Sequence, residues 1–300
     1  MTATAAASPP PSPTHGAGLT PGLRLAGISK SFGRQKVLTE LNLLAYPGRV
    51  YGLLGLNGAG KSTAFNIALG LLKPDAGRVE IQGAPFSRRS LVHVGASING
   101  PALFPQLSAR RNLLVHCRLT GTSPETIAPL LERVGLAGVG RKRAGSFSTG
   151  MKVRLSLAMA LLTDPEVLIL DEPQNGLDPQ GIIELRDLVR ALADEGRTVV
   201  VSSHQLGEIA RMSDDIGVLA GGRLVFQGPL ADFADADDER AAAALDAADG
   251  HAKTAIVMVA CDVDADEARR RLAASDGFVR AAVGEAPCSH SRFPSPSPKE

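Results

Sequence analysis

The sequence has no tryptophan, and aromatic residues fill only 4% of its 300 positions. A broad aromatic platform for stacking nucleic-acid bases is therefore not expected. Neither sign of charge is in clear excess, because 32 Lys and Arg face 31 Asp and Glu. This balance gives no overall electrostatic case for binding nucleic acid, although a local basic patch can be hidden within it.

Cysteines and long apolar runs are also scarce. The three cysteines, Cys117, Cys261 and Cys288, are far apart and form no CxxC or Cys/His spacing. A disulfide framework and a zinc module are both disfavoured. No apolar run approaches the roughly 20 residues of a spanning helix, and no Lys or Arg precedes Arg24 to begin a secretory signal. We expect a soluble, intracellular chain.

Composition divides the chain into four parts. Residues 1–22 are rich in Pro and Ala, residues 286–300 are rich in Pro and Ser, and both are predicted to be disordered tails. Residues 23–230 form the main predicted domain. Residues 231–285 form a small appendage, in which a strand over Thr254–Val263 and a helix over Ala265–Ala274 are predicted.

Short apolar runs between turn residues predict the secondary structure of the main domain. Strands are expected at Leu23–Ala26, Leu41–Ala45, Arg49–Leu54, Val167–Leu170 and Thr198–Val201. A helix is predicted over Lys61–Leu72, and residues 107–140 are expected to be mainly helical with breaks at Gly121 and Gly140. Helices between all-aliphatic strands indicate an α/β fold with a parallel sheet.

A glycine-rich segment after the third predicted strand carries the first sign of chemistry. Its residues are Gly55, Leu56, Asn57, Gly58, Ala59, Gly60, Lys61, Ser62 and Thr63. The first eight fit the phosphate-binding pattern G-x-x-x-x-G-K-[ST] between a strand and a helix. Backbone N–H groups of such a loop surround phosphate oxygens, the Lys61 ammonium reaches the β- and γ-phosphates, and the Ser62 hydroxyl ligates Mg²⁺.

An acidic pair ends the aliphatic strand Val167–Leu170. Asp171 follows the strand directly, at the edge where ligands bind in open α/β sheets. We expect Asp171 to hold Mg²⁺, directly or through water. Glu172 is then placed to accept a proton from an attacking water. The alternative is that the pair is only a helix cap.

These motifs, together with three further segments, resemble the ATP-binding subunits of ABC transporters. The segment Phe147-Ser148-Thr149-Gly150-Met151 is similar to the family's signature and lies 23 residues before Asp171. Gly176–Pro179 resembles the D-loop, and His204, 33 residues after Asp171, resembles the switch histidine. Read alone, His204 is more often an ordinary core or surface histidine. The style of these segments is similar to antibiotic- and lantibiotic-type exporter ATPases.

The resemblance implies an ABC ATPase form of the P-loop NTPase fold. It has a parallel core sheet, an N-terminal antiparallel β subdomain and a helical subdomain at about residues 100–150. The cofactors implied are ATP and Mg²⁺, with Glu172 and His204 as catalytic residues. Ser148, Gly150 and Asp178 would contact nucleotide across a dimer. Phe32 resembles the aromatic side chain that stacks on adenine, the alternative being a core phenylalanine in a hairpin.

The sequence departs from the family pattern at the loop that joins core and helical subdomain. The family usually has Gln there, and the alignment places Asn99 at that position, as a ligand of Mg²⁺ and nucleotide. Asn is one methylene shorter, so the loop must move closer or a water must fill the gap. Thr149 replaces a glycine of the signature and Leu56 replaces a common proline, and neither change removes a phosphate donor.

The function that the resemblance implies is ATP hydrolysis that energises a separate transmembrane permease, as part of an exporter. Two ATPase subunits, as a homodimer or heterodimer, would sit at the inner face of the cell membrane through that permease, and no nucleic-acid partner is expected. Two alternatives stay open: an importer ATPase, and a soluble ABC protein acting on ribosomes or DNA. The single ATPase unit and the 110 residues between Lys61 and Asp171 disfavour the ribosomal and DNA-repair types.

Overall fold

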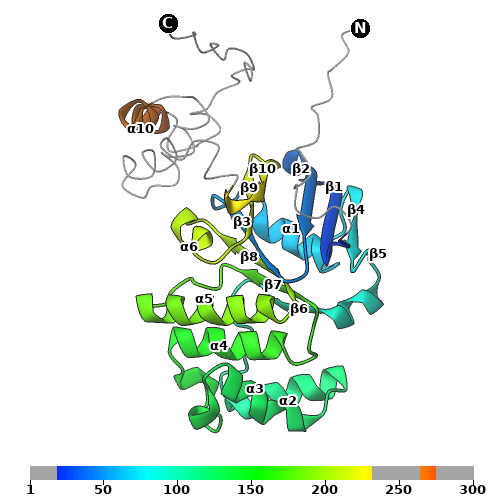
Figure 1. The fold of residues 1–300 in the computed structure, drawn as a ribbon, viewed down its shortest axis with the longest axis vertical. Helices are drawn as coiled ribbons and strands as arrows, with labels where there is room; N and C mark the ends of the chain where they lie inside the picture. The colour runs from blue at the N-terminus through cyan, green and yellow to red at the C-terminus, as the bar shows by residue number, and fades with distance from the viewer. Residues whose placement is uncertain (1–18, 232–263, 275–300) are drawn as a thin grey trace, which may run out of the picture. The chain divides into compact units, whose positions relative to one another are not determined.

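The computed structural model describes residues 19–231 and 264–274 (Figure 1). Its internal contacts divide the chain into two units, Met1–Ala236 and Asp237–Glu300. In the second unit, the described part contains helix α10 (Ala265–Ala274), which matches the helix predicted there. The Asp264 side chain accepts the Glu267 N–H at 2.8 Å and thereby caps this helix. The predicted strand Thr254–Val263, the predicted limit at residue 285, and residues 1–18 and 286–300 of the predicted tails lie outside the described residues. The domain limit predicted at residue 230 stays a prediction.

The first unit begins with an antiparallel sheet of order β2-β1-β4-β5. Its strands are β1 (Leu23–Phe32), β2 (Gln35–Ala45), β4 (Ala76–Ile81) and β5 (Ala84–Pro85). The predicted strands in this region are too short, because β1 continues six residues past Ala26 through bulges that keep it paired with β2. Gly22 also joins this sheet, since its N–H donates to Ala45.

A second sheet has six strands in the order β10-β9-β3-β8-β7-β6. Its strands are β3 (Arg49–Gly55), β6 (Val94–Ser97), β7 (Val167–Asp171), β8 (Thr198–Ser203), β9 (Asp215–Ala220) and β10 (Arg223–Pro229). All neighbouring strands run parallel except β9 and β10. The predicted parallel α/β core, with an antiparallel β part at the N-terminal side, is confirmed.

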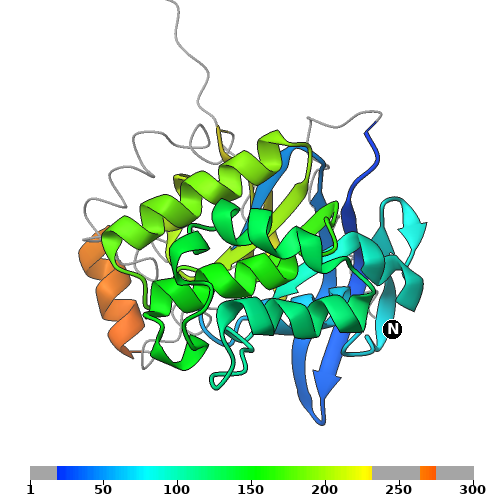
Figure 2. The same cartoon turned by 90° about the horizontal axis from the view of Figure 1, so that it is seen from below.

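Helices cover both faces of this second sheet. The helices of the first unit are α1 (Lys61–Ala68), α2 (Ala109–Thr120), α3 (Ile127–Arg133), α4 (Thr149–Ala160), α5 (Pro179–Asp194) and α6 (Leu206–Ala210), with short 3-10 helices at Arg88–His93, Pro124–Thr126, Ala137–Val139 and Ala144–Ser146. Of these, α2 and α3 pack on α4. Helices α2 to α5 lie in front of the strands in Figure 2. No helix in the described ranges is long and apolar enough to span a bilayer.

The all-aliphatic strand β7 explains why the sheet needs helices on both sides. Val167 and Ile169 belong to the apolar cluster that contains α1 and the antiparallel sheet. Leu168 and Leu170 belong to the other cluster, with α4 and α5. Because alternate residues of a strand point to opposite faces, each face of β7 is buried by a different layer.

The first helix is shorter than the apolar pattern predicts. The pattern extends to Leu72, but α1 ends at Ala68. Gly70 adopts a left-handed conformation with φ of 66°, which ends a helix at low cost only for glycine. A Cβ at Gly70 would also lie 2.3 Å from the Phe86 ring, so the packing of Phe86, the residue after β5, against this turn fixes the helix end.

Candidate active site

The glycine-rich loop turns at the carboxyl end of β3, and the turn depends on two special glycines. Gly58 and Gly60 have φ of 82° and 110°, in the left-handed region. Gly60 also has no room for a side chain, because a Cβ there would lie 2.7 Å from Leu38 Cδ2. Gly60 is the N-cap of α1, so the loop presents the N-terminus of α1 and its free N–H groups, which suit an anion.

Lys61 points its ammonium back into this loop. Its Nζ donates to the Gly55 carbonyl at 2.6 Å and lies 3.3 Å from that of Leu56. Glu172 Oε1 is 3.1 Å away and forms an ion pair with it. The side chain is only 5% exposed. The loop and the acidic pair are therefore joined by one buried cation.

Asp171 lies between two hydroxyl groups at the end of β7. Ser62 Oγ donates to Asp171 Oδ2 at 2.7 Å, and Ser202 Oγ donates to Asp171 Oδ1 at 2.6 Å. Ser202 is the register partner of Asp171 on the parallel strand β8. The sheet thus brings the first helix, β7 and β8 together around one carboxylate, and Asp171 is not a helix cap.

Three nitrogen groups, from Lys61, His204 and Asn175, surround the Glu172 carboxylate. His204 Nδ1 lies 3.1 Å and Asn175 Nδ2 lies 2.6 Å from Glu172 Oε2, while the Glu172 N–H donates to Ser202 Oγ at 2.9 Å. Burial alone would raise the pKa of this carboxyl. The hydrogen bond from Asn175 and the Lys61 ammonium outweigh burial, and the pKa is lowered. Glu172 is therefore an ionised carboxylate at neutral pH.

A pocket of about 350 Å³ opens beside these groups. Among its lining residues are Ser62, Asn99, Asp171, Glu172 and Asn175. Asn99 has φ of 56°, a conformation that Asn tolerates better than most residues. Hydroxyl, carboxylate and amide oxygens are the ligands that suit Mg²⁺, so the donor set fits this ion.

Phe32 lies at the turn between β1 and β2 and is 51% exposed. The alternative that it is a core phenylalanine is therefore wrong. The Lys30 ammonium lies 5.7 Å from the centre of its ring, a distance at which a cation is attracted to an aromatic face. The ring is available for stacking, and contact with adenine stays a prediction.

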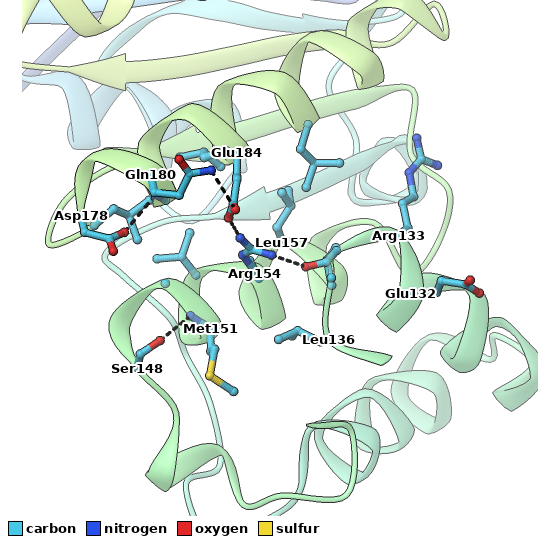
Figure 3. A pocket seen from close by; sticks show the side chains of 18 residues that line it. Glu132, Arg133, Leu136, Ser148, Met151, Arg154, Leu157, Asp178, Gln180 and Glu184 are labelled. Carbon is cyan, nitrogen blue, oxygen red and sulfur yellow. Dashed lines mark hydrogen bonds and ion pairs between the residues drawn. The ribbon is translucent and has the colours of Figure 1, made fainter. Parts of the chain in front are cut away.

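The signature and D-loop residues gather at a second pocket, of about 490 Å³, between α4 and α5 (Figure 3). Ser148, Gly150 and Asp178 line it, whereas Ser62, Asn99, Asp171 and Glu172 do not. Ser148 caps α4 by accepting the Met151 N–H at 3.3 Å, and Asp178 caps α5 by accepting the Gly181 N–H at 2.9 Å. The two pockets are neighbours, because Val153 lines both and Thr149 of the signature lines the first one.

Arg154 crosses the second pocket and joins three elements (Figure 3). Its guanidinium forms an ion pair with Glu184 of α5 and lies 3.5 Å from the Val134 carbonyl, after α3. A Cβ at Gly135, whose φ is 71°, would lie 2.5 Å from Arg154 Nη1. Arg154 therefore links the signature helix α4 to the helix that the D-loop begins.

Three site residues are absent from the sequence-based prediction. Ser202 and Asn175 contact the acidic pair, as described above. Gln174 is 3% exposed, and its Nε2 lies 2.6 Å from Ser203 Oγ, which also accepts the Gln205 N–H at 3.0 Å. Gln174 Oε1 has no partner among the described residues. The signal for Ser202 and Ser203 was available, since two hydroxyls precede His204 at the end of a strand beside β7.

A glycine-rich loop before a helix, a strand-end Asp–Glu pair and a parallel sheet together define a P-loop nucleotide hydrolase. The predicted loop runs from Gly55, the last residue of β3, to Thr63 in the first turn of α1. The fold and the site assign this class before any relative is considered.

Comparisons with known proteins agree with this class and narrow it. A family described as "ABC transporter" matches residues 38–175, and one described as "AAA domain, putative AbiEii toxin, Type IV TA system" matches residues 142–210. A lantibiotic transport ATP-binding protein, SrtF of Streptococcus pyogenes, is 41% identical over 68% of this chain and 90% of that protein. A bacitracin transport ATP-binding protein, BcrA of Bacillus licheniformis, is 42% identical over 69% of this chain and 70% of that protein.

Solved structures give the same result. The structure of cbiO1 from Clostridium perfringens, part of the ABC transporter complex cbiONQ, superposes with a TM-score of 0.67 at 27% identity, over 75% of this chain and 95% of that one. An ATP-binding subunit of an ABC transporter gives a TM-score of 0.65 at 28% identity, over 71% and 92%. The chain belongs to the ATP-binding subunits of ABC transporters. It is an ATPase whose hydrolysis drives transport.

Proposed function

We propose that this chain hydrolyses ATP to drive an exporter whose membrane permease is a separate chain. The observation that supports hydrolysis most directly is the position of Glu172, which is ionised and held by His204, Asn175 and Lys61 beside the pocket that Ser62 and Asp171 line. An ionised carboxylate at this place can accept the proton of an attacking water.

Each residue of the site has a distinct proposed role. The loop N–H groups and Lys61 bind the phosphates, so Lys61 exchanges its bonds to the Gly55 and Leu56 carbonyls for phosphate oxygens. Ser62, Asp171 and Asn99 hold Mg²⁺, which neutralises charge on the phosphates when bound. Glu172 accepts the proton from water, and His204, hydrogen-bonded to Glu172, contacts the γ-phosphate. Phe32 stacks on adenine.

Two ATPase subunits are required by this proposal. Ser148, Gly150 and Asp178 line a pocket apart from Lys61 and Asp171 of the same chain, so they are available to a nucleotide held by a facing subunit. Hydrolysis then depends on closure of the pair, as a homodimer or a heterodimer. The closure and reopening of the pair move the permease between two states.

The names of the relatives support export as the direction of transport, with a peptide antibiotic or a related compound as the cargo. Their names include lantibiotic transport, bacitracin transport, daunorubicin resistance and Nod factor export. The chain would sit at the inner face of the membrane through the permease. An importer ATPase is the second candidate, and a ribosome- or DNA-directed ATPase has no support among the relatives named here.

The proposal is tested in cells that carry the chain and a permease encoded beside it. Deleting the ATPase gene should raise sensitivity to at least one antibiotic from a panel of lantibiotics, bacitracin and anthracyclines. Wild-type protein should restore resistance, whereas Glu172→Gln should not. Unchanged sensitivity to the whole panel, combined with loss of uptake of a nutrient, would favour the importer alternative.

A further inference from the structure

Charge is distributed very unevenly along this chain. Residues 81–163 contain eleven Lys and Arg but only two acidic residues, Glu125 and Glu132, whereas the whole chain has a net charge of +1. The excess therefore belongs to the part of the molecule that contains α2, α3 and α4, and the rest of the chain is acidic on balance. The chain is therefore nearly neutral as a whole, although residues 81–163 are strongly basic.

The fold gathers five of these cations at one place. The Arg110 N–H donates to the Gly140 carbonyl at 2.9 Å, and the Ala109 N–H donates to the Lys142 carbonyl at 3.3 Å. Ser108 and Arg143 form an isolated antiparallel bridge. The start of α2 and the segment 141–143 thus run side by side. We name Arg110, Arg111, Arg141, Lys142 and Arg143 the basic patch.

The charges of the basic patch are not neutralised within the described part of the chain. All five side chains are exposed, and none has an ion pair among the described residues. Two other cations of the same region differ in this respect, since Arg133 pairs with Glu195 and Arg154 pairs with Glu184. Five clustered like charges repel one another, and an anionic partner would relieve this repulsion.

The surface beside the basic patch suits a flat anionic partner better than an apolar segment of another protein. Arg110, Arg141 and Lys142 line an open hollow of about 550 Å³, whose wall includes the small residues Ala137 and Gly138 and one carboxylate, Glu132. None of the large exposed apolar side chains of the described residues lines this hollow. Protein interfaces usually bury an apolar centre that includes large side chains. The apolar lining of this hollow is limited to Ala128, Pro129, Ala137 and the buried Leu131.

We propose that the basic patch binds the anionic phospholipid headgroups of the membrane in which the permease sits. Clusters of Lys and Arg are attracted to a negatively charged membrane surface, each contributing on the order of fivefold to binding. The proposal rests on the transporter function proposed above for its biological setting. It adds a direct contact between this subunit and lipid.

The test measures binding of the purified full-length chain to sedimented vesicles. Vesicles of phosphatidylcholine and phosphatidylglycerol should bind the wild type at low ionic strength, and vesicles of phosphatidylcholine alone should not. High salt should release the protein, because exposed charges are screened. The triple variant Arg141→Gln, Lys142→Gln, Arg143→Gln should bind on the order of a hundredfold more weakly.

A matched control removes the same amount of charge elsewhere. Lys36, Lys73 and Arg211 are exposed and lie outside residues 81–163, so their triple Gln variant should bind vesicles as the wild type does. Both triple variants should keep the wild-type melting temperature and basal ATPase rate. Those two readouts separate failure of this proposal from failure of the ATPase assignment.

Three results would overturn the proposal. The first is that wild-type protein fails to bind the anionic vesicles. The second is that the control triple loses as much binding as the basic-patch triple. The third is that duplex DNA binds the basic patch as tightly as the vesicles do, which would assign the patch to nucleic acid.

Discussion

Glu172 has three nitrogen donors around one carboxylate, and this arrangement defines the sharpest test at the scale of a residue. Changing Glu172 to Gln keeps the shape but removes the proton acceptor. We expect ATP hydrolysis to fall by about 10²–10⁴-fold with nucleotide binding retained. Because bound ATP is then not cleared, the variant should accumulate as an ATP-bound dimer, which size-exclusion chromatography with Mg-ATP would detect.

A neighbouring glutamate supplies the control for this prediction. Glu208 lies on α6, four residues after His204, and has no hydrogen bond or ion pair to the acidic pair of the site. Glu208→Gln should therefore hydrolyse ATP at the wild-type rate. Wild-type turnover by Glu172→Gln would remove Glu172 from the role of proton acceptor.

Variants of Asn99 test whether its short side chain reaches Mg²⁺ in the metal pocket. A misplacement of about 1 Å in a site can cost on the order of 100-fold in rate. If Asn99 reaches Mg²⁺ or its water only loosely, Asn99→Gln should raise the ATPase rate of the permease complex or lower its requirement for Mg²⁺. The measurement is steady-state ATPase activity against Mg²⁺ concentration.

The positive φ of Asn99 gives a competing outcome. A backbone that already brings Asn99 inward leaves no space for an extra methylene, and Gln would then slow the reaction. Asn99→Ala should slow it in both cases. Its cost in stability should be limited to about 1 kcal/mol, because the side chain is exposed and only the left-handed backbone favours Asn over Ala. Equal rates for wild type, Gln and Ala would show that Asn99 does not contact the reacting groups.

The link between α4 and α5 belongs to the scale of secondary-structure elements. Arg154 and Glu184 have side chains that are 32% and 43% exposed, so solvent screens their attraction. We expect each of Arg154→Met and Glu184→Gln to lower the free energy of unfolding by less than about 1 kcal/mol. The double variant should lose less than the sum of the two, by a coupling energy measured through urea denaturation.

The matched control for this cycle lies on the same helix. Arg186 pairs with its neighbour Asp187 and bridges no second element among the described residues, so Arg186→Met should leave stability unchanged. Strict additivity of the Arg154 and Glu184 variants would mean that the ion pair does not join the two helices in solution.

The stability of the whole molecule should depend on pH in acid. Carboxyl groups on separate elements have pKa values that are lowered by the same cause, a hydrogen bond from an arginine. A hydrogen bond from Arg133 lowers the pKa of Glu195, and one from Arg78 lowers that of Glu80, each from an ordinary value of 4.5. A carboxyl whose pKa is lower in the folded state stabilises the fold above its unfolded pKa. That contribution is lost as the pH falls below about 4.5.

We therefore expect the urea midpoint to fall between about pH 5 and pH 3. The double variant Glu80→Gln, Glu195→Gln lacks these two titrating groups and should show a shallower fall. Asp187→Asn is the comparison, since Asp187 is exposed and, within the part of the chain that the structure describes, its ion pair is with its neighbour Arg186. Parallel curves for wild type and the double variant would contradict the assignment.

The contiguous parts of the site could be predicted from the sequence. Gly55 to Thr63 act through their own backbone, and Asp171 and Glu172 directly follow an aliphatic strand, so local sequence carries their chemistry. Gln174 and Asn175 could not be predicted in this way. Their partners, Ser203 and Glu172, depend on the register of β7 against β8 and on the tight turn after β7.

The length of some elements also depended on distant contacts. The pattern of α1 continues to Leu72, but packing of Phe86 against the left-handed turn at Gly70 ends the helix at Ala68. Strand β1 continues beyond its apolar run because β2 and β4 pair with it on both sides.

The sequence by itself determined the class of this protein, since a phosphate loop and a strand-end acidic pair are read along the backbone. It also contained the basic excess of residues 81–163 as a count of charges. Only the tertiary structure decided that Arg110 and Lys142 lie on neighbouring segments, that Ser148 is in a pocket apart from Lys61, and that Phe32 is exposed. Such relations depend on packing between residues far apart in the chain, which a one-dimensional pattern does not specify.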